Sequence, residues 1–211
     1  MGPARVSPVD DLVEIEHFLP ESYADILEKL ICRSGEFLWQ YNASTNDLAA
    51  PEIMNKDARS YDSDQFVHAL YQQGERRSQF FDIVFPMFYF MEDKTGVELA
   101  AVERMKANLL VQKHIEEGRY NAPHIDIAER GHKSLLYYVK DSDGDTFIFN
   151  ETYDDVSLER SIEYTRDRKF TVGRRISPKK GRMIGFDGKH YHASMHPQVS
   201  SHRIAIAFSF V

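Results

Sequence analysis

The sequence predicts an α+β fold, in which helices come first in the chain and pack on an antiparallel sheet or sandwich. Up to about residue 98 the sequence predicts helices separated by an irregular stretch, and from about residue 99 the apolar residues follow the two-residue period of strands. Four later runs alternate in this way and are bounded by turn-forming residues: 134–140, 145–151, 181–187 and 202–211. A group of helices followed by a group of strands is typical of the α+β class.

The length and composition predict one globular domain. The chain has 211 residues, of which 42% are hydrophobic and 28% are charged, and single β-rich domains often reach this length. No linker, internal repeat or low-complexity tract divides the sequence. We therefore expect a single domain over residues 1–211, with mainly helical support over about 1–98 and a strand-rich core over about 99–211.

The first helix is expected over residues 18–33, where the apolar positions have helical spacing. Residues 41–62 are polar and irregular. Ser63 and Ser78 then have the character of N-cap residues, because a serine hydroxyl accepts a hydrogen bond from the free N–H groups at a helix start. Two further helices are therefore expected to begin at these serines.

The second of these helices contains the most apolar run of the chain, residues 80–91, and is expected to end at Gly96. Pro86 lies inside the run and should kink the helix, because proline has no backbone N–H to donate. The run is too short to span a bilayer and contains Asp82. It is therefore predicted to be a buried helix, and no membrane span is expected.

The net charge limits the partners that the protein is expected to bind, and the cysteine content indicates the cellular compartment. The formal net charge of -7 argues against nonspecific attraction of the whole molecule to nucleic acid or to an anionic membrane. Residues 160–182 nevertheless contain nine lysines and arginines against two acids, so a local basic face that contacts nucleic acid stays open. Cys32 is the only cysteine, which excludes an intramolecular disulfide and suits a reducing cytosol. A cytoplasmic location is therefore expected.

His124, Ile125 and Asp126 form the segment with the clearest chemical character. On a strand successive side chains point to opposite faces, so His124 and Asp126 would project from the same side while Ile125 packs on the other. An imidazole and a carboxylate are metal ligands, but two ligands alone would bind a divalent ion weakly. A third ligand is therefore expected from elsewhere in the fold.

The histidines near the last strand are the candidates for this third ligand, namely His190, His192, His196 and His202. His192 is preferred because of its relation to Arg203, while His190 and His196 stay open as alternatives. In the run 202–211 Arg203 shares its face only with alanine and serine, and the other face is apolar. Small residues around one arginine leave room for an anion, and the planar guanidinium suits a carboxylate.

These motifs resemble those of the Fe(II)- and 2-oxoglutarate-dependent dioxygenases, most closely the prolyl-4-hydroxylase-like group. Pro123-His124-Ile125-Asp126 is similar to the family's HxD motif, and the stretch from Tyr191 to Phe210 has its later histidine and basic residue in the same order. The resemblance covers roughly residues 105–211. It departs from the family at Asp143-Gly144-Asp145, where paired glycines are common, and in the long charged segment 151–180.

The resemblance implies a double-stranded β-helix (jelly roll) with N-terminal helices packed on its larger sheet. It implies an iron site made of His124, Asp126 and His192. It also implies that Arg203 binds the far carboxylate of 2-oxoglutarate, with help from Tyr138 and Thr146. Strand parity allows only one of Tyr137 and Tyr138 to face the metal.

The activity that the resemblance implies is hydroxylation of an unactivated C–H bond, with Fe(II) as cofactor and 2-oxoglutarate and dioxygen as cosubstrates. The carboxylate of Asp126 favours hydroxylation over halogenation, because the related halogenases lack it. A protein or peptide side chain such as proline is the expected substrate. The alternatives are an oxygenase acting on a nucleobase or small metabolite, with the basic run 160–182 contacting phosphates, and a non-catalytic metal-binding jelly-roll module.

Overall fold

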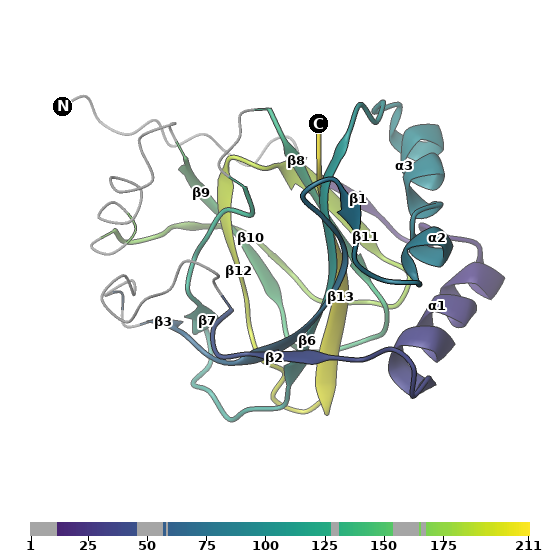
Figure 1. The fold of residues 1–211 in the computed structure, drawn as a ribbon. Coiled ribbons are helices and arrows are strands. Elements are labelled where there is room, and N and C mark those ends of the chain that lie inside the picture. Colours follow the sequence, from purple (N-terminus) through teal and green to yellow (C-terminus); the bar gives the residue numbers. More distant parts are fainter. Residues whose placement is uncertain (1–11, 46–56, 58, 128–130, 154–164, 166–167) are drawn as a thin grey trace.

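The computed structural model describes residues 12–45, 57, 59–127, 131–153, 165 and 168–211 (Figure 1). Most of the ordered elements are strands, and nearly all strand pairs are antiparallel. The few helices occur before residue 96. The expectation of a mainly antiparallel sheet with a few helices is confirmed, but the order is not, because five short or medium strands precede or separate the helices.

A large sheet forms the centre of the molecule. Its strands, in spatial order, are β1 (Val13–Ile15), β11 (Met183–Asp187), β8 (Lys133–Tyr138), β13 (His202–Phe210), β6 (Val102–Val111), β4 (Gln65–Gln72) and β2 (Gln40–Asn42). The short β5 (Glu75–Arg76) pairs with β4. Strand β13 lies between β8 and β6, so the residues of the last predicted strand occupy the middle of this sheet.

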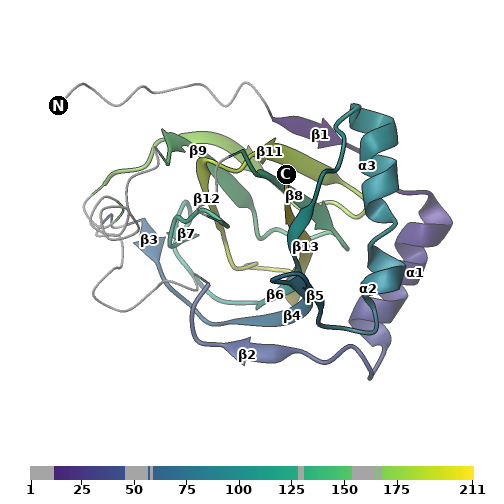
Figure 2. The same ribbon diagram turned by 45° about the horizontal axis from the view of Figure 1, so that its top comes forward.

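A smaller sheet faces one side of the large sheet (Figure 2). It consists of β10 (Val172–Ile176), β9 (Thr146–Thr152) and β12 (His190–Ser194). A separate parallel pair joins β3 (Ser60–Tyr61) to β7 (Tyr120–Asn121). Side chains from both sheets share one buried cluster: Leu136, Tyr138, Ile148, Ile176, Ile184, Phe186, Ala205 and Ala207.

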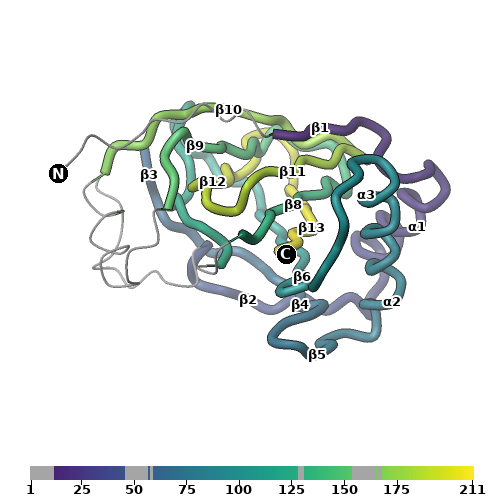
Figure 3. Tube along the Cα trace, turned by 90° about the horizontal axis from the view of Figure 1, so that it is seen from above, coloured from purple at the N-terminus to yellow at the C-terminus, as the bar shows by residue number. Residues whose placement is uncertain are grey.

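The helices lie on the opposite side of the large sheet, as the view from above shows (Figure 3). They are α1 (Glu21–Arg33), α2 (Phe81–Val84) and α3 (Met87–Thr95). The expected first helix is confirmed, although it begins after Pro20. Leu27 and Ile31 of α1 share a buried cluster with strand residues, and the rings of Phe88 and Phe208 lie 5.1 Å apart.

The alternation predicted for the last strand is present in β13. Ile204, Ile206, Phe208 and Phe210 belong to the helix-side core. Ala205 and Ala207 belong to the cluster between the two sheets. Arg203 has the same parity as these alanines, so its side chain is directed into the space between the sheets.

The apolar run 80–91 forms two helices, because the chain breaks at Pro86 between α2 and α3. Gly96 ends α3 in the left-handed conformation, with φ of 69°, as predicted. The prediction that Ser78 is the N-cap is wrong in detail, because the N-cap of α2 is Phe80, and Ser78 Oγ only accepts the backbone N–H of Phe80 just before the helix.

The helix expected to begin at Ser63 is wrong, because Gln65–Gln72 is strand β4. This segment pairs with β6 along its length, and a turn at Gln73 and Gly74, both with positive φ, returns it as β5. A short run of mixed apolar residues fits helix or strand almost equally, and the pairing with β6 decides the outcome. Residues 12–98 therefore supply strands to the large sheet as well as helices.

Within the described ranges, no helix combines the length and the apolar character that a membrane crossing requires.

Candidate functional site

The segment 122–126 lies against strand β12 through one antiparallel bridge. The backbone N–H of His124 donates to the carbonyl of His192 at 3.0 Å, and the N–H of His192 donates to the carbonyl of His124 at 2.9 Å. This pair of hydrogen bonds fixes the register between two segments that are far apart in the chain. The two histidines are therefore adjacent because of the backbone, before any ligand is considered.

The structure brings His124, Asp126 and His192 together between the two sheets. One possible ligand atom from each lies within 4.8 Å of the others, and they are the only group of this kind in the described part of the chain. His192 Nε2 is 3.6 Å from Asp126 Oδ2, and the two imidazole rings are 4.6 Å apart. This spacing allows one ion to contact all three side chains.

The orientation of each imidazole is set by a backbone carbonyl. Nδ1 of His124 is 3.1 Å from the carbonyl oxygen of Ala122, and Nδ1 of His192 is 3.4 Å from that of His190. A neutral imidazole that donates from Nδ1 carries its lone pair on Nε2. Both Nε2 atoms are therefore available to bind a metal.

The electrostatics of the three residues match the needs of a metal site. Burial lowers the pKa of His124, and it lowers the pKa of His192 to about 4, so both imidazoles are neutral at neutral pH. Burial raises the pKa of Asp126, but the Arg104 guanidinium and His192 lower it by more, and the net result is well below its usual range. Neutral histidines and an ionised carboxylate are the protonation states that bind divalent metals.

Two residues that the sequence did not single out hold Asp126. Nη2 of Arg104 donates to Oδ1 of Asp126, and Oγ of Ser134 donates to Oδ2 at 3.2 Å. Arg104 and Ser134 lie in the same row of the large sheet, because both pair with Ser209 of β13. A charged residue at an inward position of the run 102–111 was the signal that could have identified Arg104.

Arg203 forms the other end of the site. It is only 3% exposed, and Nη2 donates to Thr146 Oγ1 at 2.8 Å. The hydroxyl of Tyr138 donates to the same oxygen at 2.7 Å, and the guanidinium carbon lies 5.6 Å from the centre of the Tyr138 ring. The structure thus brings Arg203, Tyr138 and Thr146 together, while Tyr137 packs in the helix-side core.

No carboxylate among the described residues forms an ion pair with Arg203, and its Nε has no hydrogen-bond partner among them. The nearby Asp145 is occupied by an ion pair with Arg175. A buried cation that lacks an anionic partner is costly, so this arrangement favours binding of an anion from outside the chain.

Gly144 is required at its position by close packing. A Cβ atom there would lie 2.6 Å from the carbonyl oxygen of Met195 and 3.0 Å from Cδ of Arg203. The Asp143-Gly144-Asp145 turn therefore needs glycine at its centre, because a residue without a Cβ atom is what allows the chain to pack against Arg203. Asp143 accepts backbone N–H groups from the loop before β13, at 2.8 to 2.9 Å: Gln198, Val199 and Ser200.

A small pocket that opens to solvent is lined by both the triad and Arg203. Besides these residues, its lining includes Thr45, Gln65, Lys106, Asn108, Leu136 and Thr146. Asn108 Oδ1 is buried and has no hydrogen-bond partner in the described part of the chain. The predicted metal residues and the predicted anion residue therefore lie at one continuous site.

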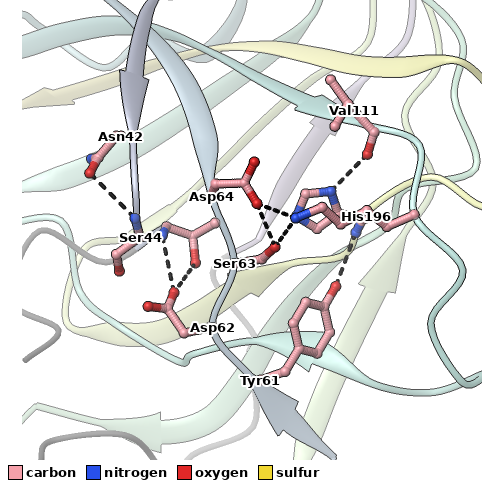
Figure 4. Close-up of polar contacts among 10 residues, drawn as sticks. Asn42, Ser44, Tyr61, Asp62, Ser63, Asp64, Val111 and His196 are labelled. Carbon is pink, nitrogen blue, oxygen red and sulfur yellow. Dashed lines mark hydrogen bonds and ion pairs between the residues drawn. The ribbon is translucent and has the colours of Figure 1, made fainter. Parts of the chain in front are cut away.

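Polar contacts near β3 and β4 hold two of the lining residues, and Figure 4 shows Asp62, which takes part in them. The backbone N–H and hydroxyl of Thr45 donate to Asp62 Oδ1 at 3.1 and 3.2 Å. Nε2 of Gln65 donates to the carbonyl of Ser44 at 3.0 Å. These contacts position Thr45 and Gln65 in the lining of the cavity.

The alternative third ligands lie outside the triad. Nδ1 of His190 is 2.9 Å from the carbonyl oxygen of Phe149. Nδ1 of His196 is 2.7 Å from that of Val111, and the backbone N–H of His196 donates to the hydroxyl of Tyr61 (Figure 4). These two histidines therefore hold strands and loops together.

The basic run 160–182 lies partly outside the described residues, which exclude 160–164 and 166–167. Several of its described members form ion pairs with acids of the same chain: Arg175 with Asp145, Lys180 with Asp25 and Glu28, and Arg182 with Glu14 and Glu16. These pairs reduce the positive charge that this part of the run offers to a polyanion.

No protein-family model matches the sequence, and no curated protein matches it. Solved structures do match the fold. A 2OG-Fe(II) oxygenase family oxidoreductase from Burkholderia pseudomallei has a TM-score of 0.60 at 11% identity, with 95% of this chain and 85% of that chain covered. A prolyl-4-hydroxylase from Pseudomonas putida has a TM-score of 0.53 at 14% identity, with 95% and 92% covered.

A third match is the non-haem α-ketoglutarate-dependent epimerase SnoN from nogalamycin biosynthesis, with a TM-score of 0.57 at 12% identity and coverage of 96% and 79%. Two of the three matched proteins, the prolyl-4-hydroxylase and the epimerase, have names that describe different reactions, yet all three share the fold. The chain therefore has the fold of the 2-oxoglutarate- and Fe(II)-dependent oxygenases, a fold in which the prolyl-4-hydroxylases are included.

Proposed function

We propose that this protein is an Fe(II)- and 2-oxoglutarate-dependent oxygenase, built as one domain over residues 1–211. In this proposal the two facing sheets form a double-stranded β-helix, and the helices pack on the larger sheet. The shared fold supports the proposal, but a fold by itself hosts many chemistries. The proposed activity therefore rests on the residues of the site.

His124, Asp126 and His192 would hold the iron. Two neutral imidazoles and one carboxylate on one side of an ion are the donor set that non-haem Fe(II) oxygenases use, and they leave positions open for other ligands. The Nε2 atoms of both histidines are directed away from the carbonyls that hold Nδ1, which fits such a site. When bound, iron and 2-oxoglutarate supply the oxidation by dioxygen that inserts oxygen into a C–H bond, with succinate and carbon dioxide as co-products.

Arg203 would bind the far carboxylate of 2-oxoglutarate, with Thr146 and Tyr138 completing this end of the cavity. The single observation that carries the proposal is the buried guanidinium that has no carboxylate partner among the described residues and lines the same cavity as the triad. Thr146 Oγ1 accepts hydrogen bonds from both the guanidinium and the Tyr138 hydroxyl, and these contacts hold the guanidinium in place. The cosubstrate then lies between this end and the metal ligands.

For the acceptor of the oxygen atom we propose a protein or peptide side chain such as proline. The similarity to the Pseudomonas putida prolyl-4-hydroxylase supports this choice. The ion pairs that occupy the described basic residues give less support to a nucleic acid substrate.

An anaerobic titration of metal-free protein with Fe(II) and then 2-oxoglutarate tests the proposal. A visible charge-transfer band is expected when 2-oxoglutarate chelates the iron, and it should be missing in His124→Ala. His190→Ala and His196→Ala should keep the band, because these histidines do not reach the triad. If Fe(II) binds the parent protein and no band develops, the oxygenase proposal is wrong and a metal-binding module without oxidation takes its place.

A further inference from the structure

Ser194 lines the cavity next to both parts of the proposed site. On β12 it shares its inward face with His192, two residues earlier in the strand. On β9 the residue paired with it is Thr146, whose Oγ1 accepts a hydrogen bond from Nη2 of Arg203 at 2.8 Å. All four residues line the same cavity. Ser194 therefore has a predicted metal ligand on its own strand and the contact that holds Arg203 on the neighbouring strand.

The register also sets how far the Ser194 hydroxyl is from an anion held by Arg203. Directly opposed residues of an antiparallel pair have Cβ atoms about 4.5–5.5 Å apart and point to the same face of the sheet. Thr146 is in direct contact with the guanidinium. A carboxylate that binds the guanidinium beside Thr146 would therefore lie within hydrogen-bonding reach of the side chain of Ser194.

Asn121 fixes the Ser194 hydroxyl and determines the direction of its hydrogen bonds. Nδ2 of Asn121, a 0% exposed residue of β7, donates to Ser194 Oγ at 3.1 Å. A serine hydroxyl has one proton to donate besides the lone pairs that accept. No acceptor for this proton is present in the part of the chain that the structure describes. The O–H of Ser194 is therefore available to a ligand in the cavity.

We propose that Ser194 donates its hydroxyl proton to the far carboxylate of 2-oxoglutarate, and that Asn121 is the positioning residue that leaves this proton for the cosubstrate. The inference rests on the proposed function, because it concerns the same cosubstrate. At neutral pH 2-oxoglutarate has only acceptor oxygens, so it needs donors from the protein. Arg203 belongs to the large sheet and Ser194 to the small one, so the carboxylate would be held from both sheets.

Two ligands test which carboxylate Ser194 binds. 2-Oxoglutarate has a carboxylate at each end, and 2-oxobutyrate has the 2-oxo acid group without the far carboxylate. Calorimetry on Mn²⁺-loaded protein gives the affinity for each. Ser194→Ala should weaken 2-oxoglutarate binding roughly tenfold or more, because a hydrogen bond to a charged group is lost, and should leave 2-oxobutyrate binding unchanged. Mn²⁺ affinity without a 2-oxo acid should stay parental, because Ser194 is not one of the three metal-binding candidates.

Asn121→Asp tests the direction of the hydrogen bond. An ionised carboxylate can only accept, so Ser194 would donate to Asp and not to the cosubstrate. 2-Oxoglutarate affinity should fall, although the serine is still present. The new negative charge also repels the ligand, so the same substitution is made in the Ser194→Ala background. It should cost a smaller factor there than in the parent, because the hydrogen bond is already absent.

Two further variants control for structural damage. Ser194→Thr keeps the hydroxyl group, and a β-branched residue suits a strand, so this variant should retain most of the 2-oxoglutarate affinity. Ser60→Ala is the matched control. Ser60 is buried, its Oγ has no hydrogen-bond partner within the described ranges, and it does not line the cavity. This variant should bind both ligands as the parent does.

The outcomes separate this inference from the proposed function. Parental 2-oxoglutarate affinity of Ser194→Ala would overturn the role of Ser194 while the oxygenase proposal stands. Equal losses for 2-oxoglutarate and 2-oxobutyrate would place the contact at the 2-oxo acid group and also overturn it. Equal factors for Asn121→Asp in the two backgrounds would overturn the role of Asn121. A parent protein that binds Mn²⁺ but neither ligand would overturn both proposals together.

Discussion

Arg104 and Asp126 form a buried ion pair that leaves one carboxylate oxygen for the metal side of the site. Arg104 donates to Oδ1, while Oδ2 accepts from Ser134 and lies 3.6 Å from Nε2 of His192. The two side chains of the pair are 16% and 5% exposed. An ion held by the three ligands would therefore contact Oδ2 of Asp126, and Oδ1 would keep its hydrogen bond with the Arg104 guanidinium.

Replacing Arg104 should cost metal-free protein more stability than metal-loaded protein. Arg104→Gln leaves the Asp126 carboxylate buried without its guanidinium, which should lower the free energy of unfolding by about 3–5 kcal/mol. Bound Mn²⁺ provides another positive charge beside the carboxylate, so the loss should be smaller in its presence. Urea unfolding with and without Mn²⁺ measures both values.

The control for this comparison is Arg76→Gln. Arg76 pairs with Asp82, but both side chains are highly exposed, at 62% and 70%. An exposed pair is worth only about 0–1 kcal/mol, so this variant should have nearly parental stability. An equal loss for Arg104→Gln with and without Mn²⁺ would contradict the link between Arg104 and the charge of the metal site.

Arg203→Ala should weaken 2-oxoglutarate binding and leave metal binding nearly unchanged. The lost contact between a guanidinium and a carboxylate is worth about 1.5–3 kcal/mol, which is roughly a ten- to a hundredfold loss of affinity. Calorimetry on Mn²⁺-loaded protein gives the 2-oxoglutarate affinity, and a separate Mn²⁺ titration gives the metal affinity. Unchanged 2-oxoglutarate affinity would remove Arg203 from the cosubstrate site.

Gly144→Ala should disturb the Arg203 end of the cavity without removing any polar group. The added methyl group would approach the Met195 carbonyl at 2.6 Å and Arg203 Cδ at 3.0 Å, so the loop or the arginine must shift. Overpacking of this kind typically costs about 1–3 kcal/mol of stability. We expect weaker 2-oxoglutarate binding together with a lower thermal midpoint. Gly35→Ala is the control, because no atom lies within 4 Å of the position where its Cβ would be.

Asp143 should make stability depend on pH in the acid range. Burial raises the pKa of Asp143, but backbone N–H groups from Ser200 and Val199 lower it by more, to about 2 from the ordinary 3.8. Because the folded state favours the ionised form, this contribution is fully present above pH 3.8 and is lost as pH falls toward 2. Between these values the free energy of unfolding should fall more steeply for the parent than for Asp143→Asn.

At neutral pH the Asp143→Asn variant should be less stable than the parent by about 1–3 kcal/mol, because charge-assisted hydrogen bonds to the loop before β13 are weakened. Urea unfolding at a series of pH values measures both effects. Asp93→Asn, an exposed position on α3, serves as the control. Parallel pH profiles for the parent and Asp143→Asn would show that the loop does not depend on this carboxylate.

The sequence was informative where one residue type has a narrow chemical use. The alternating strand 202–211 contains one arginine among small residues, and this pattern predicted the inward direction of Arg203. Gly96 was predicted as a helix end because glycine adopts positive φ at little cost. In both cases the property depends on nearby residues, so it is visible without the fold.

The sequence was less informative where contacts between distant segments determine the local structure. The strand Gln65–Gln72 was predicted as a helix because its pairing with β6 cannot be inferred from the segment itself. Arg104 and Lys106 were missed for a related reason. In the run 102–111 charged residues alternate with apolar ones, which usually indicates a strand with one face in solvent. That face lies instead beside Asp126 and the cavity.

The central place of β13 in the large sheet also affects the order of assembly. Its neighbours are β8 and β6, yet it follows every other strand of that sheet along the chain. The hydrogen bonds that join the middle of the sheet therefore close loops of many tens of residues, and contacts of this kind make folding slow. The bridge between His124 and His192 is equally non-local. Binding of a metal ion by the triad should thus be a late step of folding, and metal added during refolding should bind only after the long-range strand pairing is complete.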